Sequence, residues 1–91
     1  MLKGKNRMSL TEQMIEIPAE HEANVFGQFD AYVKKLERTF HVTLIARDGN
    51  LKIVGEQAAA EKVYRILTQL VELSRRGNTI TEQNVDYAIS L

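Results

Sequence analysis

The sequence of 91 residues contains no cysteine, no tryptophan and a single proline. The absence of cysteine excludes a disulfide scaffold, and two histidines, His21 and His41, are too few ligands for a structural zinc site. No stretch approaches the roughly 20 apolar residues that cross a bilayer, and the N-terminus lacks the apolar run of a secretory signal. We therefore expect a cytoplasmic protein without a membrane span.

Neither sign of charge is in excess, since 12 Lys and Arg residues balance 12 Asp and Glu residues. The pI is about 6.7, whereas a domain that binds nucleic acid mainly through its phosphates usually has a pI above roughly 9. Any contact with nucleic acid must therefore rest on a local patch. With 44% hydrophobic and 26% charged residues, the composition is that of a globular domain, and the length allows one small core.

Residues with the spacing of a catalytic centre are missing as well. His21 and His41 lie far apart in the sequence, and neither belongs to an HExxH frame or stands beside a nucleophile at a recognisable spacing. A nucleophile, base or metal centre would leave several such residues in a pattern. We therefore predict that these 91 residues are not an enzyme and contain no catalytic residue, no metal site and no cofactor of their own.

What is present is a clear succession of short periodic segments. The predicted elements are a strand at 13–18, helices at 19–27 and 31–40, a β-hairpin at 41–56 with the turn Asp48-Gly49-Asn50, a long helix from 57 to Gly77, and a last helix after Thr81. Pro18 puts the first strand at a sheet edge. Residues 1–12, whose basic side chains have no acidic partner, are predicted to be a flexible tail.

The two short helices meet at an elbow, Gly27-Gln28-Phe29-Asp30. Gly27 can take the left-handed conformation that ends a helix, and the carboxylate of Asp30 suits the N-cap of the next helix. Phe29 lies four residues before Val33, so we expect it to pack on the apolar stripe of that helix, with stacking on a nucleobase as the alternative.

The two last helices are amphipathic, and the final one ends abruptly. Ala59, Val63, Ile66, Leu70 and Leu73 form the predicted apolar stripe of the long helix. Thr81 is expected to cap the last helix, with Ile80 stapled onto Val85. That helix stops at Leu91 without a C-cap, and from this we expect a fragment whose parent chain continues.

The segments VFGQFDAYVKKLE, VTLIARDGNLKIVG and AAAEKVYRIL, in this order, resemble a KH domain over about Met14 to Leu73. The resemblance implies an α+β fold of KH type I, with a three-stranded antiparallel sheet, helices on one face, and here an added C-terminal helix. In KH domains a G-x-x-G loop joins the first two helices and lies against the backbone of four nucleotides. Gly27 matches its first glycine, and Asp30 stands in place of the second.

A wider resemblance covers nearly the whole chain. IEIP, FGQFDAYVKKLE, LIARDGNLKIVGE and above all LSRRGNTITEQNVDYAISL are similar to the front segment of PhoH-like proteins, which are bacterial cytosolic ATPases. This implies that residues 13–91 are the KH-like N-terminal domain of a longer chain in which a P-loop ATPase domain follows. Its G-x-x-x-x-G-K-[ST] motif is absent here, so ATP and Mg²⁺ are expected only for that other domain.

The resemblance implies an accessory module that positions single-stranded RNA for the ATPase domain. The candidate nucleic-acid-binding residues are Gly27, Gln28 and Phe29 of the elbow, Lys34, Lys35 and Arg38 of the next helix, and Arg47 on the neighbouring strand. Binding should be weak, because the carboxylate of Asp30 repels a phosphate.

An alternative reading makes the basic side chains an ordinary solvated face and the loop degenerate. The domain is then a protein-interaction module. Its sheet or last helix would dock on the ATPase domain or on a neighbouring subunit of a homo-oligomer.

Overall fold

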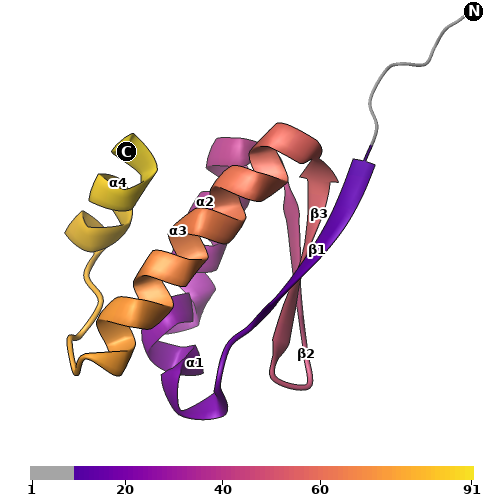
Figure 1. The fold of residues 1–91 in the computed structure, drawn as a ribbon. Helices are drawn as coiled ribbons and strands as arrows, with labels where there is room; N and C mark the ends of the chain where they lie inside the picture. The colour runs from indigo at the N-terminus through magenta and orange to yellow at the C-terminus, as the bar shows by residue number, and fades with distance from the viewer. Residues whose placement is uncertain (1–9) are drawn as a thin grey trace, which may run out of the picture.

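A three-stranded antiparallel sheet and four α-helices make up residues 10–91, the part of the chain that the computed structural model describes (Figure 1). In chain order the elements are β1 (Leu10–Glu16), α1 (Ala19–Phe26), the 3₁₀ turn η2 (Gln28–Asp30), α2 (Ala31–Phe40), β2 (Thr43–Arg47), β3 (Asn50–Glu56), α3 (Gln57–Arg75) and α4 (Glu82–Ser90). This is the predicted α+β order with its added last helix. Strand β1 begins at Leu10, inside the predicted tail, and the rest of that tail, residues 1–9, lies outside the described residues.

The sheet has the order β1-β3-β2, so β1 is an edge strand as Pro18 predicts. Ile15 pairs with Leu51, and Ile53 pairs with Leu44 across the hairpin. Alternation buries Ile15 of β1 and Ile17, which directly follows the strand, and leaves Met14 53% exposed, which confirms the predicted inner face.

Helices α1, α2 and α3 all cover the same face of the sheet, and the core lies between the two layers (Figure 1). The buried arc of α3 is wider than the predicted stripe: Ala60, Leu67 and Val71 are also buried, whereas Ala59 and Leu73 are only partly buried. The reason is that α3 contacts the sheet on one side and the other three helices around its circumference, so a single stripe cannot serve all of its neighbours.

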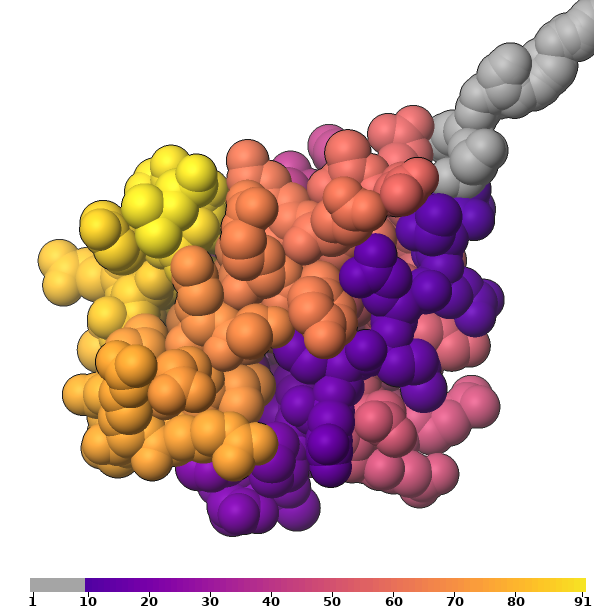
Figure 2. Space-filling view, viewed as in Figure 1, coloured from indigo at the N-terminus to yellow at the C-terminus, as the bar shows by residue number. Residues whose placement is uncertain are grey.

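Helix α4 packs on α3 at the side away from the sheet, as Figures 1 and 2 show. Its N-terminus is a capping box in which Thr81 Oγ1 accepts the amide of Asn84 at 3.2 Å and Asn84 Oδ1 accepts the amide of Thr81 at 2.9 Å. Ile80 and Val85 are buried. The predicted cap at Thr81 is therefore confirmed. No helix within residues 10–91 is long and apolar enough to cross a membrane.

The side chain of Asn24 on α1 holds the connection between α3 and α4 through hydrogen bonds. Local sequence patterns do not predict these bonds. Asn24 Nδ2 donates to Ser74 Oγ and to the carbonyl of Asn78, both at 2.8 Å, and Asn24 Oδ1 accepts the amide of Ile80 at 2.9 Å. The buried Ser74 hydroxyl also lies 2.7 Å from His21 Nδ1. These contacts fix where α4 starts, and hence which side chains of α2 it can reach.

Candidate nucleic-acid interface

The elbow between α1 and α2 has an unusual backbone. Gly27 has φ 82° and ψ 165°, and both Phe29 (φ 56°) and Asp30 (φ 59°) lie in the left-handed region. Left-handed backbone is unfavourable for residues that carry a Cβ atom, and two such residues in succession are rare. A hydrogen bond of 3.0 Å from the Asp30 amide to the Gly27 carbonyl closes the turn.

Gly27 is required here for two reasons. Its dihedral angles belong to a region that is essentially reserved for glycine. A Cβ at this position would also stand 2.7 Å from the ring of Tyr32, and that ring is held in place because its hydroxyl donates to the Ile80 carbonyl at 3.1 Å. The elbow is therefore supported from behind by the same connection that carries α4.

Two predictions about the elbow are wrong. The Asp30 side chain makes no capping hydrogen bond, because its left-handed backbone does not have the extended conformation that an N-cap requires. Phe29 does not cover the stripe that includes Val33: its own left-handed backbone turns it outward, and it is 83% exposed. The tip of the elbow thus carries a solvent-facing aromatic ring beside a free carboxylate.

The cations of α2 diverge instead of forming one face. Lys34 and Arg38, four residues apart and hence on the same side of the helix, are exposed and form no ion pair with another of residues 10–91. Lys35 points to α4 and pairs with Asp86 and with Glu82, the latter at 3.0 Å. Its hydrogen bonds to Asp86 and then to Glu82 raise the pKa of the Lys35 ammonium above the ordinary value.

The opposite flank of α2 carries a carboxylate. Glu37 Oε2 accepts the amide of Leu44 on β2 at 2.8 Å, and residues two apart on a helix lie roughly 200° apart, so Glu37 and Lys35 face different neighbours. Glu37 covers a backbone group of the outer strand β2, where an open sheet edge would otherwise be free. The sequence shows that Glu37 lies among the cations of α2, but it does not show that Glu37 accepts the Leu44 amide.

Arg47 lies apart from the α2 cations. It ends β2 and has the same parity as Thr43 and Ile45, both exposed, whereas Leu44 points into the core. Alternation therefore directs Arg47 to the face of the sheet that the helices leave open. Of the predicted site, Gly27, Gln28 and Phe29 adjoin one another in the elbow, Lys34 and Arg38 are exposed on one side of the helix that follows it, and Lys35 and Arg47 point in other directions. The described residues contain no group of three or more His, Cys, Asp or Glu side chains that could hold a metal ion.

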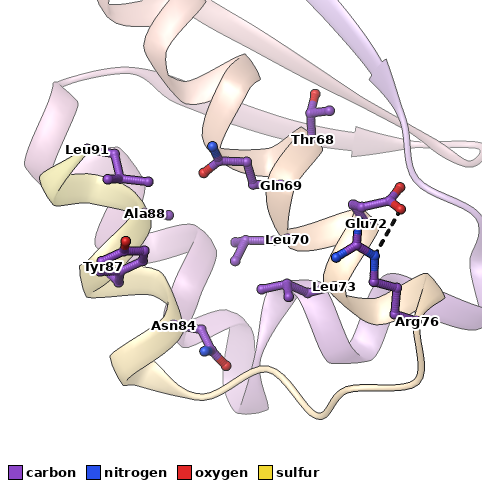
Figure 3. A pocket seen from close by; sticks show the side chains of 10 residues that line it. All are labelled: Thr68, Gln69, Leu70, Glu72, Leu73, Arg76, Asn84, Tyr87, Ala88 and Leu91. Carbon is purple, nitrogen blue, oxygen red and sulfur yellow. Dashed lines mark hydrogen bonds and ion pairs between the residues drawn. The ribbon is translucent and has the colours of Figure 1, made fainter.

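A second surface feature is an apolar groove of about 630 Å³ between α3 and α4. Leu70 and Leu73 of α3 line it from one side, and Tyr87, Ala88 and Leu91 line it from the other, as Figure 3 shows. Tyr87 is 67% and Leu91 60% exposed. The sequence indicated the apolar residues of both helices. The groove between α3 and α4 depends on the position in which α4 packs on α3.

Comparison with known proteins explains the layout of the fold. The solution structure of the first KH type I domain of human vigilin matches 80% of this chain and 83% of that domain with a TM-score of 0.68 and 17% sequence identity. No family model matches the sequence. A PhoH-like protein of Bacillus subtilis is 29% identical over 68 residues, which are 75% of this chain. The chain is homologous to PhoH-like proteins. It has the KH type I fold that the sequence predicted.

A PhoH-like protein of Mycobacterium bovis extends the match, with 23% identity over 77 residues, or 85% of this chain. These 91 residues span only about a fifth of the curated PhoH-like relatives, 21% of the Bacillus protein and 22% of the Mycobacterium protein. The similarity to vigilin concerns the fold, because fold and function are separable. What the module does follows from its own surface.

Proposed function

We propose that this KH-like module binds single-stranded RNA weakly at the elbow and positions it for the ATPase domain of a PhoH-like protein. The observation that carries the proposal is that, within a KH type I fold, the glycine elbow leads directly into a helix that exposes the cations Lys34 and Arg38 on one side. An exposed helix N-terminus adds amides that favour an anion. In this proposal the module works in the cytoplasm, where RNA and ATP are both present.

Weak binding follows from the charges at the elbow. Two cations contribute a salt slope of only about 1.4, at roughly 0.7 for each phosphate neutralised on a single strand. The Asp30 carboxylate acts against them: at about 4 Å from a phosphate it would cost roughly 1 kcal/mol in water and up to about 4 kcal/mol at an effective dielectric constant of 20. Affinity therefore depends on relieving this repulsion or on contacts with the bases.

The experiment is Asp30→Gly, which restores the second glycine of the KH loop. Affinity for a single-stranded RNA ten-mer, measured by fluorescence anisotropy at low salt, should improve about fivefold, since about 1 kcal/mol of repulsion is removed. The matched control is Asp48→Gly. Asp48 is also exposed and has φ 52°, so this variant removes the same charge and the same backbone strain at the hairpin turn. Equal binding by both variants would show that the elbow is not the RNA site.

A second candidate function rests on the groove between α3 and α4: docking of the remainder of the PhoH-like chain. Most of the length of the curated relatives lies outside the matched segment, and Leu91 itself lines the groove, so the polypeptide that follows in a longer chain would leave from its rim. Tyr87→Glu should then abolish binding of the separately produced ATPase domain in a calorimetric titration. Concentration-dependent dimerisation of the 91-residue chain that Tyr87→Glu removes would assign the groove to a second copy instead.

Under this proposal ATP and Mg²⁺ are bound outside these 91 residues. The sequence has no glycine-rich loop ending in Lys and Ser or Thr. Calorimetric titration of the 91-residue chain with Mg-ATP should show no saturable binding. A dissociation constant below about 100 µM, which corresponds to roughly −5.5 kcal/mol, would contradict the assignment.

A further inference from the structure

Phe29 is the most exposed large hydrophobic side chain of the described residues, at 83%. It buries almost nothing against its own domain, and it lies in left-handed backbone that disfavours a residue with a Cβ. Neither packing nor local conformation therefore accounts for a phenylalanine at this position. Residues held in sparsely populated backbone regions gather at binding sites, where the surrounding structure maintains them.

The support beneath Phe29 is well defined. The amide of Asp30 donates to Gly27 at 3.0 Å, and the ring of Tyr32 fills the space behind Gly27. The Tyr32 hydroxyl in turn donates a hydrogen bond to the Ile80 carbonyl. The aromatic ring is thus presented at the tip of a turn that is closed by a hydrogen bond and backed by a packed side chain, which lowers the ordering cost when a ligand binds.

The charges around the elbow favour a contact with bases over one with phosphates. Lys34 and Arg38 are the cations that remain on the outer side of α2, because Lys35 is held by α4 and Arg47 points to the open face of the sheet. Asp30 adds a negative charge at the tip. An aromatic side chain can stack on any unpaired base, because every base has a π-face, and this contact does not require a phosphate to be neutralised.

We propose that Phe29 stacks on an unpaired nucleobase and is the main source of affinity at the elbow, so that the ligand is a single strand carrying exposed bases and not a polyphosphate in general. This inference rests on the proposed RNA binding and adds the chemical group that is recognised. Double-stranded RNA, whose bases are stacked on one another, is excluded as a ligand of Phe29.

The test uses the absence of tryptophan from the chain. Phe29→Trp places the chain's single tryptophan at the proposed contact, and a single-stranded ten-mer should quench its fluorescence, whereas an abasic ten-mer with the same phosphates should not. In anisotropy measurements Phe29→Ala should weaken binding of the base-bearing ten-mer about tenfold, as expected for loss of one stacked base, and leave binding of the abasic strand unchanged. Tyr64→Ala is the control, because Tyr64 is 40% exposed beside β1 and away from the elbow.

A stability measurement separates a binding role from a structural one. Phe29→Gly should raise the thermal midpoint by a few degrees, because glycine adopts a φ of 56° without strain, while RNA binding falls as in Phe29→Ala. A lowered midpoint would show that the ring supports the fold and would overturn the inference. Equal RNA affinity of wild type and Phe29→Ala would overturn base stacking but leave RNA binding at the elbow intact. Absence of binding by the wild type to either ten-mer at low salt would overturn both.

Discussion

The N-termini of α2 and α4 are built in opposite ways. At α4, Thr81 and Asn84 satisfy one another's backbone amides through a capping box. At α2, Asp30 lies in left-handed backbone and its side chain caps nothing. The first four amides of a helix need partners from outside the helix. The start of α4 is satisfied by side chains of its own sequence, whereas the start of α2 has no side-chain cap and its first amide donates to the Gln28 carbonyl of the preceding turn.

The N-termini of α2 and α4 also differ in the contacts that stabilise them. The cap of α4 is made by residues within four positions of each other, although its place in the fold also depends on burial of Ile80 and Val85 and on the hydrogen bond from the Ile80 amide to Asn24. The start of α2 is held by Gly27, by the Tyr32 ring behind it and by a bond from Tyr32 to a carbonyl 48 residues away. A strained backbone persists only where tertiary contacts of this kind maintain it.

The largest effect is expected for Gly27→Ala, which tests how firmly the elbow is held. A Cβ would meet the Tyr32 ring at 2.7 Å while φ stays at 82°, so we expect a loss of about 3 kcal/mol in the free energy of unfolding from strain and overpacking together. Gly77→Ala is the matched control. Gly77 has φ 91° but open space around it, and its loss should be about 1 kcal/mol from the backbone alone. Equal losses in urea unfolding would mean that the Tyr32 contact is unimportant.

Val85→Ala tests whether α4 is an integral part of the domain. Val85 is fully buried, and truncating it should cost about 2 kcal/mol. For a domain of this size the thermal midpoint should then fall by about 10 °C. Tyr87→Ala, on the exposed side of the same helix, should change stability by no more than about 0.5 kcal/mol. A midpoint unchanged by Val85→Ala would show that α4 is not seated on α3 in solution.

Thr81→Ala and Asp30→Gly compare the two helix starts directly. Loss of the Thr81 cap should cost about 1 kcal/mol. Asp30→Gly should instead stabilise the chain by up to about 1 kcal/mol, because glycine relieves a left-handed residue that caps nothing. Chemical unfolding of both variants measures the change in the free energy of unfolding, which should be a loss for Thr81→Ala and a gain for Asp30→Gly. A loss of stability in Asp30→Gly would mean that Asp30 does act as a cap.

The smallest effect is expected for Glu82→Gln with Asp86→Asn, which releases Lys35 from α4. Removing two negative charges beside α2 should tighten RNA binding about twofold at low salt, and the gain should vanish near 1 M salt, where the screening length is about 3 Å. Glu72→Gln, which breaks the exposed pair with Arg76 at 3.3 Å, is the control. Unchanged binding in the double variant would show that α4 does not influence the α2 face.

The same double variant has a pH signature. The pKa of Lys35 is raised in the folded chain by Asp86 and Glu82. Its ion pairs therefore contribute to stability below the ordinary lysine value of 10.5, and that contribution is lost as the pH rises through the raised pKa. In the double variant the Lys35 pKa, followed by NMR of methylated lysines, should return toward 10.5.

Much of the fold followed from patterns within a few residues. Alternation in β1 identified the buried pair Ile15 and Ile17, the Asp48-Gly49-Asn50 turn identified the hairpin, and Thr81 identified the start of α4. Each of these signals depends on backbone geometry and neighbouring side chains, which act the same way wherever the segment lies. The boundary of β1 was missed by three residues because Leu10 to Glu12 are ordered by pairing with β3, which is distant in sequence.

The candidate site was predictable only as a set of residues, and the tertiary structure decided what they do. The sequence by itself determined that Gly27 ends α1 and that Lys34 and Arg38 share one side of α2. It could not show that Lys35 belongs to α4, that Arg47 faces the open side of the sheet, or that Phe29 is exposed. The direction of a long side chain, and the strain that a turn tolerates, depend on partners up to about 50 residues away. No local pattern encodes those partners, because they meet only when the helices pack.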